Sequence, residues 1–155
     1  MDKSKKNITN RIKTFDDAME ELGEDHPLVK EYNALCDAEV TENMVAYSRL
    51  LIVTEALNEG WKPNFVEINT RYFPYFRIYN DEEIKEILEE EKPFVIFHSK
   101  GYMFADGGMR CVKPFADTLF MNGGVGERMA FKTKELAEYA GNQFIKLYAD
   151  YFLKY

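Results

Sequence analysis

Hydrophobic positions in the first part of the chain recur every three to four residues, a spacing that predicts three helices. The first begins at Thr14, which is followed by Asp17 in a capping-box pattern, and it ends at Gly23. Pro27 occupies the first turn of the second helix. The third runs from Thr41 to a glycine at position 60, and its wide apolar surface is typical of a helix at the centre of a domain.

Beyond residue 60, β-branched and aromatic residues replace the helical pattern and predict strands. Residues 71–79 form the first of these, an edge or bulged strand, because Pro74 has no backbone N–H to donate to a ladder. Short turn sequences between the later apolar runs indicate antiparallel pairing. The further strands are expected at 94–98, 102–106, 109–115, 118–121 and 128–133.

Two more helices are expected in this second part. A short acidic helix at 81–91 carries Ile84, Ile87 and Leu88 on its inward side. A long C-terminal helix begins after Thr133 and presents a broad apolar arc as far as residue 152. Gly141 lies in this arc, where glycine weakens a helix, so we expect another backbone, that of a sheet strand, to approach closely there.

The predicted architecture is therefore an α+β domain. It has N-terminal helices, a mainly antiparallel sheet of about five strands, and a long C-terminal helix packed on the sheet. Residues 1–12 are expected to be a flexible tail, because they are polar and rich in lysine, and residues 13–155 to form a single domain. Residues 128–144 are interpreted as the structural joint between the sheet and the last helix.

Composition narrows the class of protein. Hydrophobic residues make up 46% and charged residues 30% of the chain, as in ordinary globular domains, but aromatic residues reach 15%. We expect no membrane partner, since no apolar run approaches the roughly 18 residues of a membrane span. Cys36 and Cys111 are interpreted as free thiols in a core, in keeping with a protein of the reducing cytoplasm.

The net charge of −7 is unevenly distributed. Residues 14–60 sum to −10 and residues 80–92 to −5, whereas residues 61–79 sum to +2 and residues 93–134 to +3. The cations of the predicted strands have two interpretations. In the one that we favour, they pair with the acidic helices or are simply solvated. In the other, they form an anion-binding face for single-stranded nucleic acid together with neighbouring rings. The binding residues proposed from this pattern are Trp61, Arg71, Tyr72, Tyr75, Arg77, Lys100, Tyr102, Arg110, Arg128 and Lys132.

Individual candidates for chemistry are few. His98, Asp106 and Cys111 lie close in sequence and can be drawn as a Cys/His enzyme site, but isolated Cys and His residues are usually structural, and we assign no catalytic residue. Trp61 is interpreted as part of a ring-rich core, and Arg128 as a residue that satisfies carbonyls at the start of a strand. No sequence pattern predicts a metal site or a cofactor.

The segments "LNEGWKPNF", "RYFPYF" and "GERMAFKTKELAEYAGNQFIKLYADYF" resemble a family of small uncharacterised proteins encoded by gut Bacteroidales bacteria, their phages and mobile elements. The resemblance supplies no catalytic residues. It implies an accessory role, such as binding a host protein or nucleic acid or taking part in a virion.

From these observations we expect a non-enzymatic binding module that contacts a host protein or single-stranded nucleic acid through an aromatic and basic sheet surface. Two alternatives remain open at this point. One is a structural or virion-assembly protein that forms a homo-oligomer, and the other is an enzyme with the His/Cys site named above.

Overall fold

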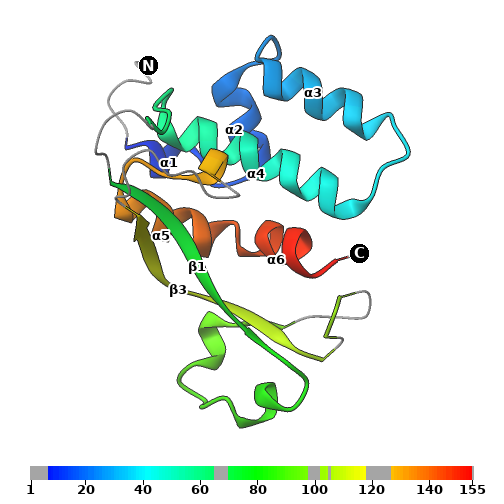
Figure 1. The fold of residues 1–155 in the computed structure, drawn as a ribbon, viewed down its shortest axis with the longest axis vertical. Coiled ribbons are helices and arrows are strands. Elements are labelled where there is room, and N and C mark those ends of the chain that lie inside the picture. Colours follow the sequence, from blue (N-terminus) through cyan, green and yellow to red (C-terminus); the bar gives the residue numbers. More distant parts are fainter. Residues whose placement is uncertain (1–6, 65–69, 98–101, 105, 118–126, 155) are drawn as a thin grey trace.

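The computed structural model describes residues 7–64, 70–97, 102–104, 106–117 and 127–154, and Figure 1 shows how they are arranged. Helical elements dominate the first 60 residues, strands the middle, and helices the C-terminus. The elements, with η for a 3-10 helix, are α1 (Ile8–Arg11), α2 (Phe15–Leu22), α3 (Pro27–Cys36), α4 (Glu42–Asn58), β1 (Arg71–Tyr79), η2 (Glu83–Glu86), η3 (Lys92–Phe94), β2 (Ile96–Phe97), β3 (Gly108–Asp117), η4 (Glu127–Met129), α5 (Lys134–Gln143) and α6 (Ile145–Leu153).

The three N-terminal helices predicted from the sequence are confirmed as α2, α3 and α4. The Thr14 hydroxyl accepts from the Asp17 N–H while the Asp17 carboxylate accepts from the Thr14 N–H, which forms a complete capping box. Helix α4 has buried side chains on all sides, including the fully buried Leu50, Ile52 and Leu57. It therefore occupies the central position that its wide apolar surface predicts.

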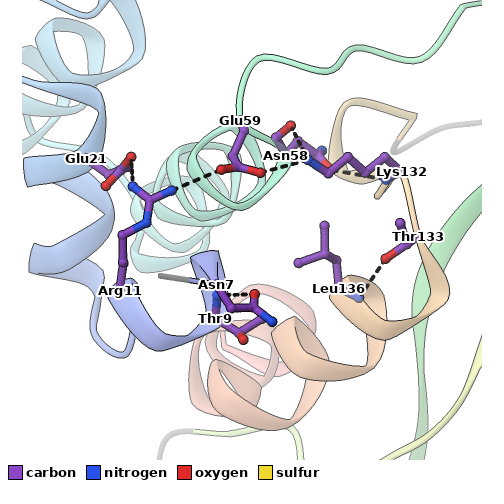
Figure 2. A network of polar contacts seen from close by, with 9 residues as sticks. All are labelled: Asn7, Thr9, Arg11, Glu21, Asn58, Glu59, Lys132, Thr133 and Leu136. Atoms are coloured by element: carbon purple, nitrogen blue, oxygen red, sulfur yellow. Dashed lines mark hydrogen bonds and ion pairs between the residues drawn. The ribbon is translucent and has the colours of Figure 1, made fainter. Parts of the chain in front are cut away.

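The expectation of a flexible tail does not hold for residues 7–12. Ile8 and Ile12 are buried in the core, and Arg11 forms ion pairs with Glu21 of α2 and with Glu59 at the end of α4 (Figure 2). The polar composition of this segment conceals two apolar residues that face inward, and their burial holds a short helix against the body of the protein.

The sheet is antiparallel, as predicted, and among the described residues it has three strands in the order β1–β3–β2. The pairing of β1 with β3 shifts between Phe73 and Tyr75, so Pro74 lies at an irregularity on an edge strand, where the missing N–H is tolerated.

The prediction of about five strands is not confirmed. Among the described residues, the run 94–98 contributes the two residues of β2, and 102–106 contributes one isolated bridge at Tyr102. The run 128–133 folds as η4 followed by a single bridge between Phe131 and Tyr72, and 118–121 lies outside the described residues.

The acidic segment 81–91 does not form the predicted helix, since only the 3-10 turn η2 is present. Ile84 and Ile87 face inward as expected and form a small second cluster with Tyr79 and Val95, whereas Leu88 is exposed. Successive like charges along this segment oppose a regular helix, and the cluster fixes the chain instead.

The single C-terminal helix predicted from the apolar arc is two helices, α5 and α6, which meet at Phe144. They lie between α4 and the sheet, because α5 packs on β1 and β3 while α6 packs on α4 and β3 (Figure 1). At Gly141 two strands do approach closely, but through side chains and not through backbone as expected: a Cβ at this position would lie 2.4 Å from the Cys111 Sγ atom and 3.0 Å from the Pro74 Cβ atom. The neighbouring atoms belong to strand side chains rather than to backbone.

Asn58 connects α4 to the segment that precedes α5. Its Nδ2 donates to the Ala130 carbonyl at 2.8 Å. Its Oδ1 accepts from the Lys132 N–H at 3.1 Å, and Figure 2 shows these two residues side by side. The Thr133 hydroxyl then caps α5 by accepting from the Leu136 N–H. These contacts support the interpretation of residues 128–144 as a structural joint, since they fix the C-terminal helices to the core.

Candidate functional site

Three of the cations that were proposed for binding form ion pairs within the protein. Arg71 is 1% exposed and donates to the Glu127 carboxylate at 3.0 Å. The other two are Arg110, which pairs with Glu91, and Lys132, which pairs with Glu59 (Figure 2). The pairs of Arg110 and Lys132 agree with the charge-pairing interpretation, because Glu91 and Glu59 lie in the two acidic segments, whereas Glu127 does not. Lys100 lies outside the described residues.

Tyr102, also proposed for binding, is held in a polar cluster at α6. Its hydroxyl donates to the Asp150 carboxylate, Lys146 approaches the same hydroxyl at 3.3 Å, and Lys154 lies 5.4 Å from the centre of its ring. Burial, followed by the hydrogen bond to Asp150, raises the pKa of Tyr102 above its ordinary value. The ring and the hydroxyl of Tyr102 therefore fix this residue to α6.

The remaining strand residues form what we call the outer sheet face, which points away from α5 and α6. Side chains of directly paired residues lie on the same face of a sheet. The outer sheet face is therefore defined by the pairs Phe73–Phe115, Tyr75–Val112 and Arg77–Arg110. Phe97 belongs to the same face because it pairs with Gly108, two residues before Arg110. Its members are Phe73, Tyr75, Arg77, Phe97, Arg110, Val112 and Phe115.

The inner residues of β1 behave differently from the outer ones. The Phe76 ring packs on Tyr148 and Phe152 of α6, and Tyr72 is half-buried beside Phe131. On the outer sheet face, by contrast, Tyr75, Phe115 and Phe97 are 59%, 57% and 56% exposed. Of the proposed residues, Tyr75, Arg77 and Arg110 thus share one open surface, whereas Tyr72 does not belong to it.

Trp61 and Arg128 come together at a second place, which we call the Trp61 pocket. It is a cavity of about 440 Å³ between α3, the C-terminal half of α4 and η4. The sequence alone did not place these two residues together, because 66 positions separate them in the chain. The pocket is lined by His26, Pro27, Leu28, Leu51, Thr54, Glu55, Asn58, Trp61, Lys62, Pro63, Arg128 and Ala130.

Arg128 does not begin a strand, as was expected, but lies exposed in η4. It also lines a second cavity, of about 540 Å³, which shares Leu51 with the first and continues along α4 toward Tyr47 and Tyr151. Arg128 therefore stands where two cavities meet on the same side of α4. Trp61, interpreted from the sequence as a core ring, is half-buried at the pocket.

Sequence reasoning missed His26 and Thr54 as pocket residues. His26 was interpreted only as part of a helix start, and it does cap α3 by accepting from the Leu28 N–H at 3.3 Å. A usable signal was present in α4, because the polar residues Thr54 and Asn58 are four positions apart and so share one side of the helix, between positions that are mostly apolar.

The Cys/His arrangement is not supported as a reaction centre. Cys111 is buried, and burial, followed by the charge of Glu138, raises the pKa of its thiol to about 11. A catalytic cysteine needs a lowered pKa, since the thiolate is the nucleophile. Asp106 lies in an exposed turn and His98 is outside the described residues. Cys36 is also a free thiol, but it is exposed rather than in the core as predicted.

Within the described ranges, no group of three or more His, Cys, Asp or Glu side chains is arranged to hold a metal ion. The same part of the chain has no helix with the length and apolar character needed to cross a bilayer. A scan against protein-family models, a search of curated proteins and a search of solved structures found no match to this chain.

Proposed function

We propose that this chain is a non-enzymatic binding module and that the outer sheet face contacts a partner protein. One observation carries the proposal: α5 and α6 cover one face of the sheet, while the other leaves Tyr75, Phe97 and Phe115 more than half exposed. Exposed apolar patches are uncommon on the surface of monomeric proteins, and where they occur they often mark interaction sites.

The chemistry of the outer sheet face favours a protein partner over nucleic acid. Aromatic rings beside arginine are the residue types that dominate binding energy in protein interfaces. Arg110 is already paired with Glu91, and Arg77 lies over the Tyr79 ring at 4.9 Å from its centre. A ring contact does not neutralise a charge, so Arg77 leaves one positive charge on the outer sheet face, which gives weak attraction for a phosphate backbone.

The resemblance to proteins of gut Bacteroidales phages and mobile elements supports a host protein as the partner. An accessory protein of such an element acts in the cytoplasm of its host or as a component of the virion. Both locations are part of this proposal.

A pull-down from host lysate tests the proposal, with and without nuclease treatment. The double variant Tyr75→Ser/Phe115→Ser removes two exposed rings and is expected to lose the partner. The control Leu88→Ser removes an exposed apolar side chain between η2 and η3, outside the outer sheet face, and is expected to retain it. Capture that is equal for all three proteins contradicts the assignment of this face.

Single-stranded nucleic acid is the second candidate, since Tyr75 and Phe115 present rings on which bases can stack beside Arg77. It predicts nuclease-sensitive capture and oligonucleotide binding that weakens steeply with salt.

Assembly with further copies of this chain is the third candidate, because β1 is an edge strand of the sheet. Light scattering of the purified protein distinguishes it, since a stable oligomer without any ligand supports assembly instead of partner binding.

A further inference from the structure

The Trp61 pocket is separate from the outer sheet face, and its chemistry points to a different kind of ligand. Most of its wall is apolar, with Leu28, Leu51 and Pro63 beside the half-buried Trp61 ring. A volume of about 440 Å³ falls within the range of roughly 300–1,000 Å³ that is usual for small-molecule sites. The pocket is therefore large enough for one flat ring with a short substituent.

Arg128 supplies an uncommitted positive charge to this pocket. Every other arginine of the described residues has a partner, either an acid, as for Arg11, Arg71 and Arg110, or an aromatic side chain, as for Arg49 and Arg77. Arg128 is exposed and has neither among those residues. A guanidinium with free N–H groups is the side chain best suited to hold a carboxylate through two parallel hydrogen bonds.

Two further pocket residues bring hydrogen-bond donors. Thr54 is 2% exposed, and its hydroxyl has no hydrogen-bond partner in the described part of the protein. His26 accepts the Leu28 N–H at Nδ1, which leaves Nε2 as the nitrogen that carries the proton in the neutral ring. A buried hydroxyl without a partner is costly, so a ligand that hydrogen-bonds to Thr54 gains stabilisation that the empty pocket lacks.

The side chains of Asn58 and Glu55, in contrast, already have partners within the protein. The Glu55 carboxylate faces Lys62 at 3.8 Å, and both ends of the Asn58 amide are used by Ala130 and Lys132. The groups left over are donors and one cation, which match an anionic acceptor rather than a cationic or neutral donor ligand.

We propose that the Trp61 pocket binds a small aromatic carboxylate. The carboxylate lies against the Arg128 guanidinium within reach of the Thr54 hydroxyl, and the ring of the ligand packs on the Trp61 indole. This site does not depend on the outer sheet face, so each proposal can fail without the other.

Trp61 is the sole tryptophan of the chain, and its fluorescence therefore reports on this pocket alone. The protein is titrated with benzoate and phenylacetate, and in parallel with benzamide and phenylacetamide, which keep the ring but lack the charge. Ionic strength is held constant with sodium chloride. The carboxylates are expected to change the Trp61 emission saturably below about 10 mM, and the amides to bind at least about tenfold more weakly.

Matched variants assign the contacts. Arg128→Gln is expected to weaken benzoate binding by at least about tenfold, and Thr54→Val, which removes only the hydroxyl, by about threefold to tenfold. Arg77→Gln removes a similar charge from the outer sheet face and is expected to leave the affinity unchanged.

Circular dichroism confirms that each variant is folded before titration. The proposal is overturned if the carboxylates give no saturable change, if the amides bind as tightly as the acids, or if Arg128→Gln and Arg77→Gln have equal effects.

Discussion

Replacing Gly141 by alanine tests how closely α5 packs on the sheet. Alanine favours a helix over glycine by about 1 kcal/mol, so in open space the substitution would stabilise the protein. Here the added Cβ would lie 2.4 Å from the Cys111 Sγ atom, which is itself buried, and 3.0 Å from the Pro74 Cβ atom of β1. Overpacking of this kind costs about 2–3 kcal/mol. The net expectation is therefore a loss of about 1–2 kcal/mol in the free energy of unfolding.

Cys111→Ala provides the background that isolates this clash, because it removes the nearest atom and leaves the Cys111 Cβ at an ordinary 3.6 Å. In that background Gly141→Ala is expected to be neutral or to stabilise by up to about 1 kcal/mol, which gives an interaction energy of about 2 kcal/mol. Urea denaturation of the four proteins measures these differences. Asn142→Ala, an exposed substitution in the same helix, controls for helix propensity. If Gly141→Ala stabilises the protein equally with and without Cys111, the explanation of Gly141 by close packing is wrong.

Three further substitutions test other contacts of the fold. Asn58→Ala leaves the Ala130 carbonyl and the Lys132 N–H without their partner and is expected to lower the free energy of unfolding by about 2–4 kcal/mol in the same urea assay. A loss under about 1 kcal/mol would refute the role of Asn58 in connecting α4 to the segment before α5. Thr54→Val removes a buried hydroxyl that has no hydrogen-bond partner among the described residues, and it is expected to raise the free energy of unfolding by about 1 kcal/mol in the absence of ligand. A free energy of unfolding below that of the parent protein would show that the hydroxyl does make a hydrogen bond. The pKa of Cys111 is raised from its ordinary value of 9.0 to about 11 in the folded protein, so the folded state holds the thiol proton more tightly than the unfolded state does. The stability that the protonated thiol contributes is therefore present below pH 9 and is lost as the pH rises toward 11. Cys111→Ala is expected to lose less stability than the parent over that interval, and identical pH profiles of the two proteins would contradict the assignment.

Local patterns predicted the starts of several helices well. Thr14 with Asp17, Pro27, and Thr133 mark helix starts that the structure confirms, since capping depends on residues within one turn of each other. Pro74 likewise indicated an edge strand with an irregular register. The strands were less predictable, because a β-branched or aromatic run becomes a strand only where a neighbouring strand completes its hydrogen bonds. Phe131 obtains a single bridge to Tyr72, and its segment remains a turn.

The candidate site was predictable only in part, for a related reason. The sequence identified Tyr75, Arg77 and Arg110 as a possible surface, but it also included Arg71, which is identical in type and lies buried against Glu127. No local signal distinguishes a paired arginine from a free one, since the partner is 56 residues away in the chain.

The sequence by itself determined the starts of α2, α3 and α5 and the segregation of charge, because both depend on residues close together in the chain. Only the tertiary structure decided that Ile8 and Ile12 belong to the core, that the outer sheet face is left open, and that Trp61 and Arg128 line one pocket with Thr54. Burial and pairing depend on which distant segments meet, and that is fixed by the packing of all the elements together rather than by any one of them.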